Sequence, residues 1–199
     1  MPKLNSREYR AVRKIDIRAG ENEENSYIVE GYATTFNEPY EMYEWEGNKY
    51  YEQVDRHAFD NADLKDVILQ YDHEGMVYAR IKNGTLRLEI DEHGLKVIAD
   101  LSSTEESRKL YEAISTGLVC NMSFAFTVEE DSYNRDERTR TIMKIRKVYD
   151  VSAVSIPANP GTDISARSYF DGVIEAERQE MSERERRIRI LKLKAESEI

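Results

Sequence analysis

Residues 118–128, LVCNMSFAFTV, are the stretch of sequence that decides the fold. Large apolar side chains occupy alternate positions in it: Met122, Phe124, Phe126 and Val128. This period of two is typical of a β-strand that buries one face. Ser123 falls on the opposite face between two large apolar neighbours, so we expect a hydroxyl held in one direction by a rigid strand. A serine with no chemical role on the less buried face also fits the pattern, and composition alone favours that interpretation.

Further strands are predicted on both sides of this stretch. Alternating or β-branched runs indicate strands at 27–36, 67–73, 86–90, 95–101 and 140–156, with Pro157 and Pro160 ending the last one. Residues 91–94, Asp-Glu-His-Gly, predict a hairpin turn with Gly94 at a position that tolerates positive φ. Residues 37–53 and 129–139 show neither period and are predicted to be loops.

Two short helices are predicted between the strands. Asp55 is a candidate N-cap for the first, which would contain Ala58, Phe59 and Leu64. Residues 103–106, Ser-Thr-Glu-Glu, have the pattern of a capping box, and the helix they begin is expected to end at Gly117. A chain of strands with few helices predicts an α+β fold, mostly β, in which a curved or closed antiparallel barrel-like sheet removes the edges.

Composition divides the chain into three expected parts: a polar mobile arm at 1–25 that contributes at most one edge strand, a domain at 26–170, and a charged helical tail at 171–199. In the tail, apolar residues recur every seven positions at Ile174, Met181, Ile188 and Ala195. The companion positions Glu177 and Arg184 are charged, so this is half of a heptad seam. It predicts a helix that docks on a partner or on the domain; a frayed charged tail is equally compatible.

Charge and cysteine content exclude several classes of protein. The net charge of −10 argues against nucleic acid as the main partner, because such proteins bind phosphates through a basic face. No stretch approaches the roughly 20 apolar residues of a membrane helix, which argues against a membrane protein. A single cysteine, Cys120, rules out an internal disulfide. The charged first residues are not followed by the apolar segment of a secretory signal. Together with the lack of an internal disulfide, this predicts a cytoplasmic protein.

Chemistry by a serine would require a base, for which histidine is suited by its pKa near 6.5. Of the three histidines, His93 lies in the predicted hairpin turn and His57 in the predicted short helix, both expected at the surface. His73 ends a predicted strand, in YDHEG, although a lone histidine there is more often structural. Cys120 is a rival nucleophile to Ser123, but free cysteines are more often buried small hydrophobes. The histidines and cysteine show no metal-ligand spacing.

Six stretches in order resemble the tailed-bacteriophage prohead protease family, which is distantly related in fold and mechanism to the herpesvirus assembly proteases. They are IVEGYATTFNEPY (28–40), VDRHAFDNAD (54–63), VILQYDHE (67–74), EHGLKVIADL (92–101), NMSFAF (121–126) and VYDVSAVSIPANPGTDISA (148–166). NMSFAF is similar to the Ser-Phe-Gly-Phe nucleophile strand of the family, with Ala125 in place of glycine. Any one stretch is a weak signal, but six in register from about Tyr27 to Ala166 are specific.

The resemblance implies a serine endopeptidase domain at 26–170 that needs no cofactor, with Ser123 as nucleophile and His73 as general base. It suggests Asp150 as the third member, because the family has an acid before Val-Ser; His57, which stands where the family usually has glycine, is a minor candidate. It implies action in the host cytoplasm inside the assembling prohead. The implied partners are the scaffold segment of the major capsid protein, portal or scaffolding proteins, and the chain itself as a substrate and in a homo-oligomer.

Two other functions are compatible with the sequence. One is an inactive assembly module that binds capsid protein; retention of both His73 and Ser123 weighs against it. The other is a cysteine hydrolase using Cys120, although Cys120 and Ser123, three apart on one strand, would face opposite sides.

Overall fold

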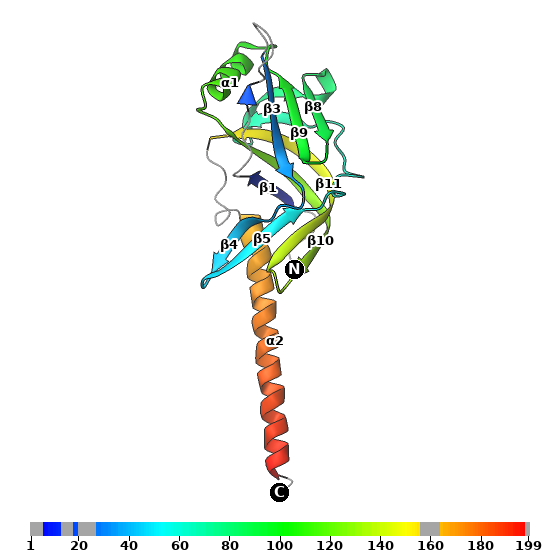
Figure 1. Cartoon of the computed structure of the whole chain (residues 1–199), viewed down its shortest axis with the longest axis vertical. Helices are drawn as coiled ribbons and strands as arrows, with labels where there is room; N and C mark the ends of the chain where they lie inside the picture. Colours follow the sequence, from blue (N-terminus) through cyan, green and yellow to red (C-terminus); the bar gives the residue numbers. More distant parts are fainter. Residues whose placement is uncertain (1–5, 13–17, 20–26, 156–163, 198–199) are drawn as a thin grey trace.

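The computed structural model describes residues 6–12, 18–19, 27–155 and 164–197 and contains two β-sheets and two α-helices (Figure 1). The first sheet has seven strands: β1 (Arg7–Val12), β4 (Tyr40–Trp45), β5 (Asn48–Val54), β6 (Ile68–Tyr71), β7 (Glu74–Arg80), β10 (Asn121–Asn134) and β11 (Thr139–Val154). The second has four: β2 (Arg18–Ala19), β3 (Ile28–Thr35), β8 (Leu86–Ile90) and β9 (Gly94–Asp100). The helices are α1 (Glu105–Ser115) and α2 (Ile164–Ser197).

The predicted α+β class, mostly strands, is confirmed, but the sheets are not closed into a barrel. Nor is the larger sheet purely antiparallel. The long strand β11 pairs antiparallel with β10, but its first residues lie parallel to β5 and its last residues lie parallel to β6. One hydrophobic core contains side chains from both sheets and from α1, among them Val97, Leu110 and Phe124.

The two regions predicted as loops contain strands. Residues 40–54 form the β4–β5 hairpin, whose turn is made by Glu46 (φ 49°) and Gly47 (φ 77°). Strand β10 extends to Asn134, so only a short turn remains of the loop predicted at 129–139. The predicted strands at 86–90 and 95–101 are confirmed by β8 and β9, apart from one residue at each end of β9.

Three local predictions were wrong in detail. Residues 56–61 form turns and no helix, with Asp55 Oδ1 accepting a hydrogen bond from the His57 backbone (2.8 Å). The N-cap of α1 is Thr104, whose side chain accepts from the Ser107 backbone (3.0 Å), so the N-cap lies one residue later than predicted and Ser107 stands where the capping box would have Glu106. Gly94 does not have positive φ; it is needed because a Cβ there would lie 2.0 Å from the Thr34 carbonyl oxygen.

Helix α2 begins before the predicted tail boundary and projects from the sheets (Figure 1). Its first part is docked: Phe170 and Ile174 are buried in a cluster with Met42, Tyr43 and Tyr50 of the β4–β5 hairpin. Farther along, apolar side chains are exposed: Met181, Ile188, Ile190 and Leu191. The side chain of Ala195 and the residues Pro157 and Pro160 lie outside what the structure describes. In the part of the chain described, neither helix is both long and apolar enough to cross a membrane.

Candidate active site

The three residues named by the resemblance lie together, joined through the imidazole of His73. His73 Nε2 lies 2.6 Å from Ser123 Oγ, and His73 Nδ1 lies 2.5 Å from Asp150 Oδ1. Ser123 and Asp150 are buried, whereas the His73 side chain keeps 15% exposure. A hydroxyl, an imidazole and a carboxylate in this order form the arrangement that allows a serine to be deprotonated and the resulting imidazolium to be stabilised.

Adjacent strands bring Ser123 and Asp150 to one face of the first sheet. Strands β10 and β11 are antiparallel, with Ser123 opposite Ser152 and Ala125 opposite Asp150. Because side chains two residues apart on a strand share a face, Asp150 and Ser152 both point toward the side that carries Ser123. Two rigid central strands therefore fix the hydroxyl and the carboxylate.

The third side chain is supplied by a tight turn. The sequence predicted His73 at the end of a strand, but β6 ends at Tyr71 and His73 sits in the turn to β7. Asp72 (φ 48°) and His73 (φ 61°) both have left-handed backbone conformations, which are uncommon for residues other than glycine. The turn is held in place because Asp72 Oδ1 accepts a hydrogen bond from the Ser155 backbone (3.0 Å), next to the end of β11. This backbone conformation aims the imidazole at Ser123.

Sequence reasoning missed three residues around this site. The Ser152 hydroxyl donates to Asp150 Oδ1 (3.0 Å) and lies 3.2 Å from His73 Nδ1. Arg7 forms an ion pair with Asp150 Oδ2, and the ring of Tyr9 meets the His73 ring edge-on with centroids 4.8 Å apart. The period of two could have suggested Ser152, which follows Asp150 by two residues. Arg7 and Tyr9 carry no such signal, because they are far from the site in sequence.

The other candidate residues lie elsewhere. His57 is largely exposed and its Nδ1 lies 3.1 Å from Asp60 Oδ2. His93 packs edge-on against Tyr32 in the β8–β9 turn. Cys120 is exposed just before β10, where its sulfur accepts from Asn121 Nδ2 (3.5 Å). Within the described residues, the hydrogen-bonding partners of the His73 ring are Ser123, Asp150 and Ser152, so neither His57 nor Cys120 joins the site.

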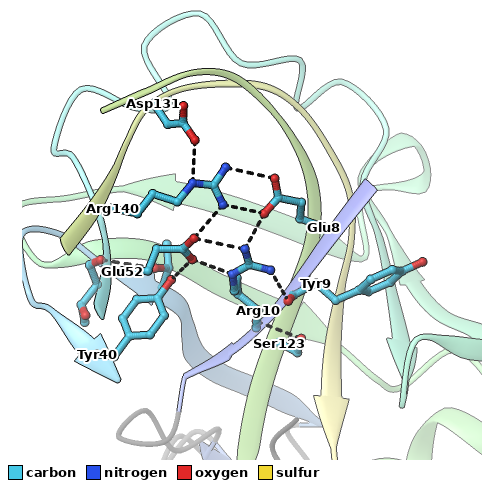
Figure 2. A network of polar contacts seen from close by, with 10 residues as sticks. Glu8, Tyr9, Arg10, Tyr40, Glu52, Ser123, Asp131 and Arg140 are labelled. Atoms are coloured by element: carbon cyan, nitrogen blue, oxygen red, sulfur yellow. Dashed lines mark hydrogen bonds and ion pairs between the residues drawn. The ribbon is translucent and has the colours of Figure 1, made fainter. Parts of the chain in front are cut away.

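The edge strand β1 lies along the strand that carries Ser123. It pairs antiparallel with β10 from Arg7 opposite Thr127 to Val12 opposite Met122. The Ser123 hydroxyl donates a hydrogen bond to the backbone carbonyl oxygen of Arg10 (2.9 Å) (Figure 2). Ser123 is only 2% exposed. The hydroxyl therefore contacts both the imidazole and the backbone of β1.

A buried ionic network anchors β1 on the face of the sheet opposite to Ser123, His73 and Asp150. Figure 2 shows the side chains of this network. Its members are Glu8 and Arg10 of β1, Glu52 of β5, Asp131 of β10 and Arg140 of β11. Arg10 Nε donates to Glu52 Oε1 (2.5 Å), and Arg140 Nη1 donates to both Glu8 Oε2 and Glu52 Oε2 (2.9 Å each). Tyr40 also donates to Glu52 Oε1 (2.7 Å).

The two arginines control the ionisation of Glu52. Burial raises the pKa of this carboxyl, but Arg10 and Arg140 outweigh burial and hold the pKa at about 2. Burial lowers the pKa of Arg140, and the carboxylates of Glu52 and Glu8 more than reverse this, so it stays above its usual range. Both side chains are therefore charged at neutral pH, and the buried charges are paired.

Comparison with known proteins identifies the family of the chain. The sequence profile of the family described as Caudovirus prohead serine protease matches residues 13–182. Searches of curated proteins and of solved structures gave no match. The matched range includes His73, Ser123 and Asp150 and begins immediately after β1.

Proposed function

Because the chain belongs to the caudovirus prohead serine protease family, we propose that it is a serine endopeptidase whose nucleophile is Ser123, whose general base is His73 and whose third member is Asp150. The single observation that carries this assignment is the position of the His73 imidazole. Its two nitrogens lie 2.6 Å from Ser123 Oγ and 2.5 Å from Asp150 Oδ1. An imidazole bonded at one nitrogen to a carboxylate presents its other nitrogen as a base.

The proposed reaction is acyl transfer to the enzyme followed by hydrolysis. His73 Nε2 takes the proton of Ser123, and Oγ attacks the carbonyl carbon of a peptide bond. The imidazolium then gives its proton to the leaving amine, and a water molecule releases the acyl group by the same route in reverse. Asp150 holds the proton on Nδ1 and stabilises the imidazolium. Ser152 donates to the same carboxylate oxygen and helps to orient it.

The proposed substrates are proteins of the prohead interior, inside the assembling shell in the host cytoplasm. They are the scaffold segment of the major capsid protein, portal or scaffolding proteins, and the protease itself by autocleavage. The family description, which places these proteases at the prohead, supports this range. The projecting helix α2 is proposed as the handle that carries the protease into the prohead by binding scaffold.

The deciding experiment is co-expression of the capsid protein with the wild-type chain or with Ser123→Ala. Removal of the nucleophile is expected to lower the rate by several orders of magnitude, so both chains should keep their full mass on a gel. Cys120→Ala is the matched control and should process both chains as the wild type does. If Ser123→Ala still processes the capsid protein, the assignment is wrong. If the wild type processes nothing, the inactive assembly module becomes the better description.

A further inference from the structure

The nucleophile is closed to substrate in this conformation. Ser123 is 2% exposed, and its hydroxyl donates to the Arg10 carbonyl oxygen (2.9 Å). A hydroxyl has one proton, so donation to Arg10 and donation to His73 Nε2 exclude each other. While the proton is directed to Arg10, it is not available to the base. Part of the molecule has to move before a peptide can reach Ser123.

Strand β1 is the part that covers the site. Besides the contact of Arg10 with Ser123, Arg7 pairs with Asp150 and Tyr9 lies edge-on to His73. The strand is extended, antiparallel to β10, and presents a backbone carbonyl to the nucleophile. An extended peptide that adds to a sheet edge is a common mode of peptide recognition, and a backbone carbonyl is the group that a serine peptidase attacks. β1 therefore lies as a substrate would lie.

Strand β1 is also separable from the rest of the fold. It is at the end of its sheet and, among the described strands, pairs with β10 alone. It also precedes the region, residues 13–182, that matches the protease family. An edge strand can leave without breaking any other strand pair, and its departure would expose the backbone of β10 for pairing with another chain.

The ionic network shows which peptide could replace β1. Glu8 and Arg10 leave with the strand as one negative and one positive charge, so the charge of the remaining network does not change. Glu52 keeps its contacts with Arg140 and Tyr40, and Arg140 keeps Asp131. The vacated surface then presents the Glu52 carboxylate where the Arg10 side chain lay, and the Arg140 guanidinium where the Glu8 carboxylate lay.

We propose that β1 is a built-in pseudosubstrate, and that the peptides this site cleaves carry an acidic residue two positions before a basic residue whose carbonyl is attacked. This inference rests on the proposed function. The basic residue pairs with Glu52 and the acidic residue with Arg140, in the positions of Arg10 and Glu8. Displacement of β1 by such a peptide frees the Ser123 hydroxyl for His73.

The first test compares two peptides with the full-length wild-type chain. One contains Glu-Tyr-Arg-Ala, the sequence of residues 8–11, and the other contains Arg-Tyr-Glu-Ala with the charges exchanged. Mass spectrometry should show cleavage of the first after arginine, about 10-fold or more faster than cleavage of the second, because like charges would meet in the network. Equal rates, or cleavage elsewhere, would overturn the proposal.

The second test releases β1 by charge reversal. Glu8→Arg/Arg10→Glu places like charges against Arg140 and Glu52 and should raise the rate on the Glu-Tyr-Arg-Ala peptide by about 10-fold or more. The control Glu130→Lys/Lys144→Glu reverses an exposed pair and should leave the rate unchanged. Circular dichroism checks folding, and Glu8→Gln, a milder change expected to act in the same direction, is used if the double variant does not fold. A folded variant no faster than the wild type overturns the proposal.

Labelling by a fluorophosphonate, which reacts with activated serines, separates this inference from the proposed function. If Ser123 is not labelled in any variant and the capsid protein is not processed, the proposed function is wrong. The pseudosubstrate proposal, which rests on it, is then wrong as well. If Ser123 is labelled and peptides are hydrolysed, but the rate depends neither on the charges of the peptide nor on the release of β1, the proposed function holds and only the pseudosubstrate proposal is wrong.

Discussion

At the scale of single residues, the site depends on two backbone conformations that are uncommon outside glycine. Asp72 and His73 both have positive φ, at 48° and 61°. Such conformations cost of order 1–3 kcal/mol and persist where the surroundings enforce them. Here the Asp72 carboxylate is fixed by the Ser155 backbone, and the imidazole of His73 is fixed by Asp150. The strain is placed where it aims the proposed base at Ser123.

Replacing Asp150 by asparagine tests the third member of the site. The amide nitrogen of Asp150→Asn can donate to His73 Nδ1, which favours the tautomer with its proton on Nε2 and removes the base. In other serine proteases this change lowers kcat by about 10⁴-fold, and a loss of at least about 10³-fold is expected here. The measurement is peptide hydrolysis at pH 7, with the melting temperature as the check on folding. His57→Ala is the control and should retain activity, because His57 is exposed at a different place. Activity within 10-fold of the wild type would exclude Asp150 from the triad.

Local pattern alone did not identify the site residues. The period of two placed Ser123 on a strand, but only the order of the family stretches distinguished it and His73 from structural residues. Ser152 and Asp150 lie two residues apart and share a face of β11, so the same period could have predicted that Ser152 lies beside Asp150. Arg7 was not, because its contact with Asp150 joins segments 143 residues apart. No local period encodes such a pairing.

At the scale of elements, the β4–β5 hairpin explains both a failed prediction and the attachment of α2. The hairpin was predicted as a loop because residues 37–53 are crowded with tyrosines and acids and show neither period. One of these acids, Glu52, occupies an inward position of β5 between the buried Tyr50 and Val54. A carboxylate there breaks the apolar alternation, and its burial depends on Arg10 and Arg140 from distant strands, with Tyr40 as a further donor. The same hairpin contributes Tyr43 and Tyr50 to the cluster that holds Phe170.

The docking of α2 predicts a local effect of Phe170→Ala. Phe170 is fully buried, with its ring centroid 5.4 Å from that of Tyr50 and 6.3 Å from that of Tyr43. Truncation of a buried phenylalanine costs about 3–5 kcal/mol, so the first turns of α2 should lose their contact with the hairpin. Hydrogen exchange of residues 169–180 should accelerate more than that of residues 122–128 of β10, which belong to the main core. Met181→Ala, at an exposed position of the same helix, is the control and should change stability by less than about 0.5 kcal/mol. Unchanged exchange in the Phe170 variant would show that this contact does not hold the helix.

At the scale of the whole molecule, the end of α2 extends beyond both the sheets and the family match. The match ends at residue 182, and from there to Leu191 the described side chains are exposed. Deletion of residues 183–199 removes this part but keeps Phe170 and Ile174 on the hairpin. We expect normal peptide hydrolysis and a severalfold loss of incorporation into proheads, measured by quantitative blotting of purified particles. Normal incorporation of the truncated chain would remove the packaging role from this part of the helix.

The buried ionic network joins β1, β5, β10 and β11 and makes the stability of the whole molecule depend on pH. The pKa of Glu52 is lowered from 4.5 to about 2. Because the folded-state pKa is the lower one, the stabilisation is fully present above about pH 4.5 and is lost as the pH falls toward 2. A shift of this size corresponds to roughly 3 kcal/mol.

Urea unfolding of the wild type and Glu52→Gln at pH 7 and pH 3 measures this linkage. At pH 7 the variant should be less stable by about 3–5 kcal/mol, since Arg10 and Arg140 remain buried with fewer carboxylates to pair with. At pH 3 the difference should shrink by on the order of 2 kcal/mol, because unfolding of the wild type is then accompanied by protonation of Glu52. Glu41→Gln removes an exposed partner of Lys49, and its effect should stay below about 1 kcal/mol at both pH values. If the difference in unfolding free energy between the wild type and Glu52→Gln does not change with pH, the arginines do not keep Glu52 charged. The proposal that Glu52 pairs with a basic residue of the substrate would then be wrong.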